Sequence, residues 1–209
     1  MRVYHFLNEQ FGLNDLKERR LKIARIMELN DPFEFLGADL TSVDYRRVLQ
    51  ETKSELSKSN GLLCFSRNWT NPLLWGHYAD KHKGVCLGFD VPDDNLKEVE
   101  YVSERFPIPA VIDDLFMKKL LSTKFEHWQY EEEYRTFVSL TDDIDGYYYA
   151  NFSDNLKLKQ VIVGVQSPIT KAQIFEALGD LAVGVEAFKV RAAFKSFEVV
   201  PQNNPALWV

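Results

Sequence analysis

The sequence predicts an α+β fold, with mixed, mostly antiparallel sheets and inserted helices. Two observations favour this class. Short apolar runs that suit buried strands recur along the chain, most clearly at Leu158–Val165. Capped stretches with helical spacing separate these runs, and the longest spans Thr41–Ser59. No repeat, low-complexity tract or linker interrupts the 209 residues, so we expect one domain over residues 1–209.

The chain up to residue 59 predicts two strands and three helices. The strands are expected at Arg2–Leu7 and Leu21–Arg25, and the helices at Leu16–Arg20, Asn30–Glu34 and Thr41–Ser59. Alternating hydrophobicity supports the strands. Asn14-Asp15 offers a cap for the first helix, and Asp31 followed by Pro32 is a typical start for the second.

The stretch Gly61–Asp90 has the composition of a pocket wall. Apolar runs at Gly61–Phe65 and Gly84–Phe89 predict two buried strands. Between them, Asn71-Pro72 caps a short helical segment that is rich in Trp, His and Tyr. Two strands would thus hold a segment crowded with hydrogen-bonding side chains, which suits a pocket better than a plain core.

The rest of the chain predicts further strands and two helices. The strands are expected at Leu96–Val102, Tyr130–Leu140, Tyr147–Phe152, Leu158–Val165, Val183–Val190 and Phe194–Val200, and the helices at Val111–Thr123 and Thr170–Leu178. Several of these strands look like antiparallel neighbours, in keeping with an α+β fold.

Composition and charge describe an ordinary globular protein. The net charge of −6 weighs against a sequence-independent nucleic-acid binder, although a local basic groove would still allow one. Met1–Phe6 turns polar at once, unlike a signal peptide, and no apolar run approaches the roughly 20 residues of a membrane helix. We therefore expect a cytoplasmic protein without membrane contact. Cys64 and Cys86 are expected to be reduced, buried thiols, with a disulfide between neighbouring strands as the alternative.

An acidic cluster, Glu131-Glu132-Glu133, is the sequence feature that most suggests chemistry. If Tyr130–Leu140 is a strand, then Glu131, Glu133 and Arg135 share one face. A carboxylate beside an arginine stays ionised and fixed in geometry, as a general base or a stabiliser of developing positive charge must be. The alternative is a solvated edge strand with surface ion pairs.

His77 and Tyr78 are the next candidates. On a helix that begins at Asn71 they share a face with Leu74. His77 and His82 are five residues apart, which is not the spacing of a zinc pair on one helix face, so we expect no metal site there. The alternative is a core histidine packed among aromatic rings. The chain also lacks the common nucleotide, redox and hydrolase motifs.

A set of motifs, taken together, resembles the bacterial DUF2971 family. They are Tyr4-His5-Phe6, Leu21-Lys22-Ile23, Asn30-Asp31-Pro32-Phe33-Glu34, Leu63-Cys64-Phe65-Ser66, Leu74-Trp75-Gly76-His77-Tyr78-Ala79-Asp80, Lys83-Gly84-Val85-Cys86-Leu87-Gly88-Phe89-Asp90 and Trp128-x-Tyr130-Glu131-x-Glu133-Tyr134-Arg135. They occur in the family's order from residue 4 to about 140. The resemblance implies membership of this family, and it implies no activity by itself.

The opening strand, the short helix and the second strand also resemble the start of the DNA ADP-ribosyltransferase toxins. This resemblance implies a split-sheet core and NAD as a substrate. By motif, His5 would hold the NAD ribose, and Ser66 or Tyr78, with His77 beside it, would line the nicotinamide pocket. Glu133 would be the catalytic carboxylate, preceded by Glu131 and flanked by Arg135. The protein would then be a toxin or anti-phage effector that modifies a protein or a nucleic acid.

Two other functions fit the same residues. The first is a metal-dependent hydrolase or nuclease, whose Mg²⁺ or Mn²⁺ would be held by Asp31, Glu34, His77, Asp80 and Glu133. The second is a non-catalytic binding or sensor module, in which the aromatic and charged motifs brace an interface.

Overall fold

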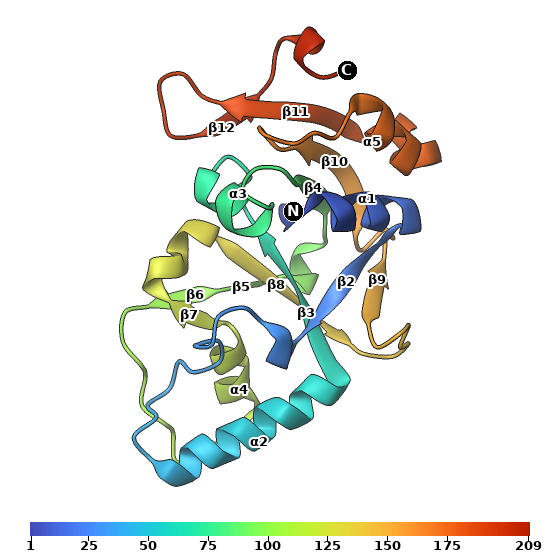
Figure 1. Ribbon diagram of the computed structural model, residues 1–209. Coiled ribbons are helices and arrows are strands. Elements are labelled where there is room, and N and C mark those ends of the chain that lie inside the picture. Colours follow the sequence, from blue (N-terminus) through green and yellow to red (C-terminus); the bar gives the residue numbers. More distant parts are fainter. The chain divides into compact units, whose positions relative to one another are not determined.

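The computed structural model describes all 209 residues, which form two compact units. Unit 1 comprises residues 1–21, 65–93 and 150–209, and unit 2 comprises residues 22–64 and 94–149. Each unit is built from segments that are far apart in the sequence (Figure 1). The predicted α+β class is confirmed, because helices accompany sheets whose strands pair mostly antiparallel.

Unit 1 contains a sheet with the strand order β12-β11-β10-β4-β1. The strands are β1 (Arg2–Leu7), β4 (Val85–Asp90), β10 (Lys157–Val163), β11 (Glu186–Ala192) and β12 (Val199–Pro201). β4 pairs antiparallel with both β1 and β10, and β10 pairs parallel with β11. The apolar runs of β4 and β10 suit these central places, because helices cover both faces of the sheet.

One face of this sheet is covered by α1 (Glu9–Glu18) and α5 (Lys171–Leu178), which contact each other. Gly12 of α1 lies against Val85, where an added Cβ would clash with the valine side chain. Asn8 caps α1 by accepting a hydrogen bond from the Phe11 N–H. The sequence-based cap at Asn14-Asp15 is therefore wrong, and the helix begins earlier than predicted.

The other face of the sheet is covered by α3 (Pro72–Tyr78), which begins after the predicted cap Asn71. Trp75 of α3 is fully buried and packs with Cys86 and Ile162. Cys86 and Ile162 are directly paired on β4 and β10, so they share this face. The unit ends with η4 (Gly179–Val183) and η5 (Pro205–Leu207).

Unit 2 combines a long helix with short strands. Its elements are η1 (Ile26–Glu28), α2 (Val43–Ser59), β5 (Lys97–Glu98), β6 (Glu100–Val102), α4 (Asp114–Leu121), β7 (Thr123–Phe125), η3 (Glu126–Glu131) and β8 (Glu133–Ser139). β8 pairs with β5, and β6 and β7 form a two-stranded parallel sheet. The chain passes between the units within β2 (Arg20–Arg25), β3 (Asn60–Ser66), η2 (Asp93–Asn95) and β9 (Tyr148–Asn151).

The core of unit 2 lies between α2 and α4, which are close to each other in Figure 1. Tyr45 and Leu49 of α2 pack with Phe116 and Leu120 of α4. The helix predicted at Thr41–Ser59 is confirmed. It begins after Ser42, whose side chain caps α2 by accepting a hydrogen bond from the Tyr45 N–H. By contrast, the helix predicted at Asn30–Glu34 is wrong, since those residues form a turn.

Both cysteines are free, so the alternative of a disulfide is wrong. Cys86 is buried, and Cys64 is partly buried. None of the helices has the length and apolar character needed to cross a membrane.

Candidate functional site

Five charged side chains of unit 2 form a buried ion cluster: Glu34, Lys124, Glu131, Glu133 and Arg135. None of them is more than 7% exposed. Arg135 donates from Nε to Glu133 and from Nη2 to Glu34, each over 2.8 Å. Lys124 donates from Nζ to Glu131 over 2.6 Å and to Glu133 over 3.2 Å. Each cation therefore bridges carboxylates, and the alternative of a solvated edge strand is wrong.

Glu131 and Glu133 belong to different secondary-structure elements. Glu133 and Arg135 lie on β8, and strand alternation puts them on one face, as predicted. Glu131 ends η3, and Glu132 has a left-handed backbone with φ of 45°. The prediction of one strand starting at Tyr130 is therefore wrong, because this left-handed residue separates the helical turn from the strand.

Glu34 enters the cluster from a turn held by its own backbone. Asp31 accepts a hydrogen bond from the Phe33 N–H at its side chain and from the Glu34 N–H at its carbonyl. Phe35 then takes a left-handed φ of 61° and is fully buried. The N-D-P-F-E motif was the only sequence signal for Glu34, and no pattern marked Lys124.

The cluster keeps Glu133 ionised away from water. Burial alone would raise the pKa of Glu133, but the charge and hydrogen bonds of Arg135, together with the charge of Lys124, lower it to about 2. Burial would lower the pKa of Lys124, yet the surrounding glutamates raise it. With all five groups ionised, three carboxylates face two cations, so the cluster is formally negative by one charge.

Neighbouring side chains enclose the cluster. Tyr101 Oη accepts a hydrogen bond from the Glu133 N–H over 2.8 Å. The Cys64 thiol is hydrogen-bonded to Glu133, and burial, reinforced by that carboxylate, raises its pKa. The Arg135 guanidinium lies 5.6 Å from the centre of the Phe35 ring, and Lys124 Nζ lies 4.9 Å from that of Trp128.

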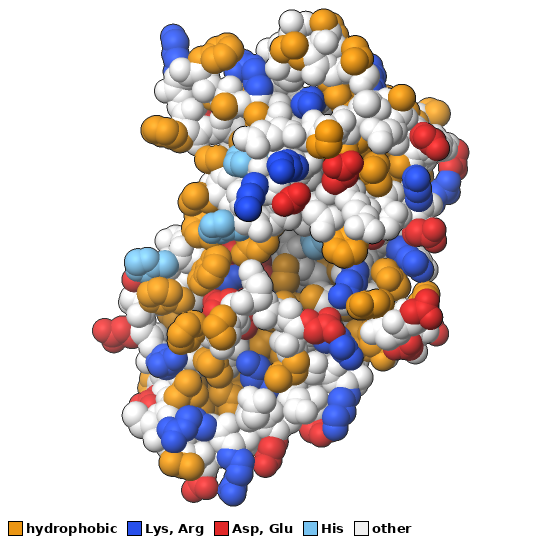
Figure 2. Space-filling view, in the orientation of Figure 1, with side chains coloured by type: hydrophobic (Ala, Val, Ile, Leu, Met, Phe, Trp, Pro, Cys, Tyr) orange, Lys and Arg blue, Asp and Glu red, His pale blue; other side chains and the backbone are white.

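A pocket of about 370 Å³ opens beside the cluster, and we call it the aromatic pocket. It is lined by Asp31, Phe33, Leu36, Gly37, Val102, Ser103, Glu104, Arg105, Thr123, Lys124, Phe125 and Trp128, all in unit 2. Hydrophobic side chains gather on the surface of unit 2 over β6, β7 and α4 (Figure 2). Lys124 belongs to both the pocket and the ion cluster, so it is the link between them.

The remaining predicted site residues lie in unit 1 and are not all brought together. Tyr4 pairs directly with Ser66, so these two side chains share a face of the sheet. His5 points to the opposite face, where its ring contacts Phe65 edge-on. Ser66 is buried and holds a tight turn, donating to the Asn68 carbonyl and accepting from the Asn68 N–H. His5 and Ser66 therefore leave the sheet in opposite directions.

His77 and Tyr78 do share a surface. Both line an open hollow of about 930 Å³ that also includes Phe6, Asn8 and Lys17. Their rings contact each other edge-on, 6.0 Å apart. The sequence predicted that His5, Ser66, His77 and Tyr78 bind NAD, and of these His77 and Tyr78 line this hollow. Their role in binding NAD stays a prediction. Glu131, Glu133 and Arg135 belong to unit 2.

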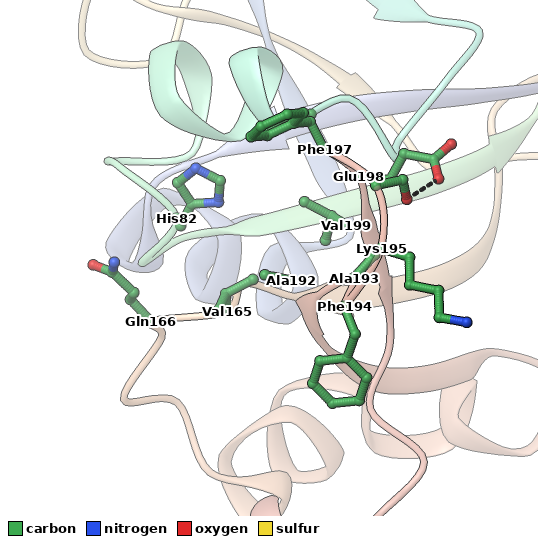
Figure 3. Close-up of a pocket in the computed structure, with 12 residues that line it drawn as sticks. His82, Val165, Gln166, Ala192, Ala193, Phe194, Lys195, Phe197, Glu198 and Val199 are labelled. Carbon is green, nitrogen blue, oxygen red and sulfur yellow. Dashed lines mark hydrogen bonds between the residues drawn. The ribbon is translucent and has the colours of Figure 1, made fainter.

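A second pocket in unit 1, of about 610 Å³, was missed by the sequence analysis (Figure 3). His82 lies at one end, with a left-handed φ of 69° and its ring stacked on Trp75. Its Nδ1 is buried without a hydrogen-bond partner. Phe194 and Phe197 point in opposite directions from the loop between β11 and β12 (Figure 3), and both are almost fully exposed. No sequence spacing links these residues.

The donor set gives no support to the metal-dependent alternative. No three His, Cys, Asp or Glu side chains are grouped so that they could hold a metal ion. Glu34 and Glu133 are instead bound to Arg135, and Asp31 supports its own turn. His77 and Asp80 belong to unit 1, whereas Asp31, Glu34 and Glu133 belong to unit 2.

Comparison with known proteins found no matching family model, no matching curated protein and no matching solved structure. Membership of the DUF2971 family and the split-sheet core therefore stay predictions from the sequence motifs.

Proposed function

We propose that the protein consumes NAD, transferring ADP-ribose to a macromolecule or to water, with Glu133 as the catalytic carboxylate. The observation that carries this proposal is the charge state of Glu133, which Arg135 and Lys124 keep ionised although it is only 4% exposed. Away from water, a fixed negative charge acts strongly on a developing positive charge.

The reaction requires such a charge. When the bond between the ribose C1′ and the nicotinamide nitrogen breaks, the nicotinamide leaves with the electron pair and the ribose becomes an oxocarbenium-like cation. An ionised carboxylate stabilises that cation until the acceptor oxygen or nitrogen attacks C1′ and loses its proton. Arg135 would orient Glu133, and Glu131 would share Lys124 with it.

The same geometry favours a second candidate, the binding or sensor module. Both carboxylate oxygens of Glu133 already accept hydrogen bonds, one from Arg135 and the other from Arg135 and Lys124. In such a module the ion cluster would only hold the turn that carries Glu34 against β8.

The two candidates differ in NAD turnover. An NAD-consuming enzyme is stabilised against heat by NAD or a stable analogue, and it releases nicotinamide. Replacing Glu133 by Gln should abolish that release, whereas the same change at the adjacent, exposed Glu132 should leave it intact. A binding or sensor module would release no nicotinamide in any variant, and Glu133→Gln would lower only its stability.

A further inference from the structure

The aromatic pocket of unit 2 has aromatic rings exposed on its walls. Phe33 is 63% exposed and Phe125 is 47% exposed, and both line the pocket together with Trp128. Exposed apolar rings that gather at a cavity mark a binding surface. Flat aromatic faces of this kind are the surfaces on which planar ligands stack.

The backbone of the turn holds Phe33 in this exposed place. Asp31 fixes the turn through the Phe33 N–H, and Glu34 is anchored to Arg135 in the ion cluster. Phe35, two residues further on, is buried at a left-handed φ, a conformation that costs energy for a residue other than glycine. Phe35 is therefore buried in the core, whereas Phe33 lines the pocket.

Charge differs between the inner end and the rim of the pocket. The inner end meets Lys124 and, behind it, the formally negative ion cluster, and Asp31 adds a buried carboxylate. At the rim, Arg105 is exposed, and its Nε donates to the Leu36 carbonyl over 3.0 Å, which holds the guanidinium in place. The Asp31 carboxylate therefore favours a ligand's hydrogen-bond donors, and Arg105 favours an anion such as phosphate.

We propose that the aromatic pocket binds a nucleotide whose base carries an amino group. The base stacks on the exposed aromatic walls, its amino group donates to the carboxylate of Asp31 or Glu104, and its phosphate is bound by Arg105. The ligand is either a free mononucleotide or one residue of a single-stranded nucleic acid. This site does not depend on NAD turnover, because none of its contacts requires Glu133 to act on a substrate.

The test is calorimetric titration of the protein, without NAD, with AMP, CMP, UMP and a short oligoadenylate. We expect AMP and CMP to bind saturably and more tightly than UMP, which lacks the amino group. Phe33→Ala should weaken AMP binding about tenfold through lost stacking. Arg105→Ala should weaken it several-fold, and more so at low salt. Both side chains are exposed, so both variants should fold.

Matched controls lie elsewhere in unit 2. Phe137 is 40% exposed on β8, and Arg47 is exposed on α2, and neither lines the pocket. Phe137→Ala and Arg47→Ala should leave AMP affinity unchanged. Equal affinity for AMP and the oligonucleotide would assign the site to free nucleotides, and tighter oligonucleotide binding would assign it to a strand. The proposal is overturned if no nucleotide binds, if UMP binds as tightly as AMP, or if Phe33→Ala and Arg105→Ala bind AMP normally.

Discussion

Arg135 holds Glu133, two residues before it on β8, through two separate hydrogen bonds. Nε donates to Oε1 over 2.8 Å and Nη2 donates to Oε2 over 3.0 Å. The same Nη2 reaches Glu34, which is 101 residues away in the sequence. One fully buried guanidinium therefore joins a strand to a distant turn.

Replacing Arg135 by Ala should strongly destabilise the protein. The change leaves Glu34 and Glu133 buried with only Lys124 as a cation, and breaking a buried pair on one side costs roughly 3–5 kcal/mol. Urea denaturation measures this loss. Lys58→Ala, which removes an exposed pair with Glu55, is the control and should change stability by no more than about 0.5 kcal/mol. An equally small effect at Arg135 would show that the cluster does not hold the fold.

Lowering the pH should reduce the folding stability of the protein, because Glu133 becomes protonated. The pKa of this carboxyl is about 2 in the folded state, against an ordinary value of 4.5. A lowered folded-state pKa means that the stabilisation, on the order of 3 kcal/mol, is fully present above pH 4.5 and disappears as the pH falls towards 2. Urea titrations at several pH values should therefore show a smaller penalty for Glu133→Gln near pH 2 than near pH 6. A penalty independent of pH would contradict this linkage.

Asp15 should make the folding stability fall as the pH rises, which is the opposite of the effect of Glu133. This α1 residue is 7% exposed, and its burial, opposed only by the charge of Arg20, raises its pKa from 3.8 to about 7. The folded state thus holds a proton that the unfolded state has lost, so stability falls as the pH rises from about 4 to 7. Asp15→Asn removes this effect and should stabilise the protein by about 4 kcal/mol at pH 8.

The measurement for Asp15 is thermal or urea unfolding of both proteins across this range. The gain should be near zero at pH 4, where both the acid and the amide are neutral. Asp180→Asn, which removes an exposed carboxylate that pairs with Arg19, serves as the control for the loss of a surface charge. If Asp15→Asn stabilises the protein as much at pH 4 as at pH 8, then packing and not the ionisation of Asp15 causes the stabilisation.

Strong local patterns allowed much of the fold to be predicted from the sequence. The strand Arg2–Leu7, the cap at Asn71 and the helix predicted at Thr170–Leu178 are confirmed, because alternation, capping and helical spacing are decided within a few residues. The turn at Asp31–Glu34 was predicted as a helix, because Asp followed by Pro starts turns as well as helices. The hydrogen bonds that Asp31 accepts within the turn, together with the contact of Glu34 with Arg135, favour the turn.

The candidate site was only partly predictable for a similar reason. Strand alternation placed Glu133 and Arg135 on one face, but it could not reveal Lys124, which comes from β7. Nor could residue types alone show that His5 and Ser66 point to opposite faces of the sheet. That difference depends on the pairing of Tyr4 with Ser66, which is a matter of register between distant segments.

The proposed reaction is tested most directly by measuring nicotinamide release from NAD by purified protein, for the wild type, Glu133→Gln and Glu132→Gln. A urea titration of each variant should accompany the assay, so that loss of fold is distinguished from loss of chemistry. We predict release by the wild type and by Glu132→Gln, and none by folded Glu133→Gln. Release by folded Glu133→Gln at the wild-type rate, or no release by the wild type with each acceptor class supplied (protein, DNA, RNA and water), would contradict the proposal.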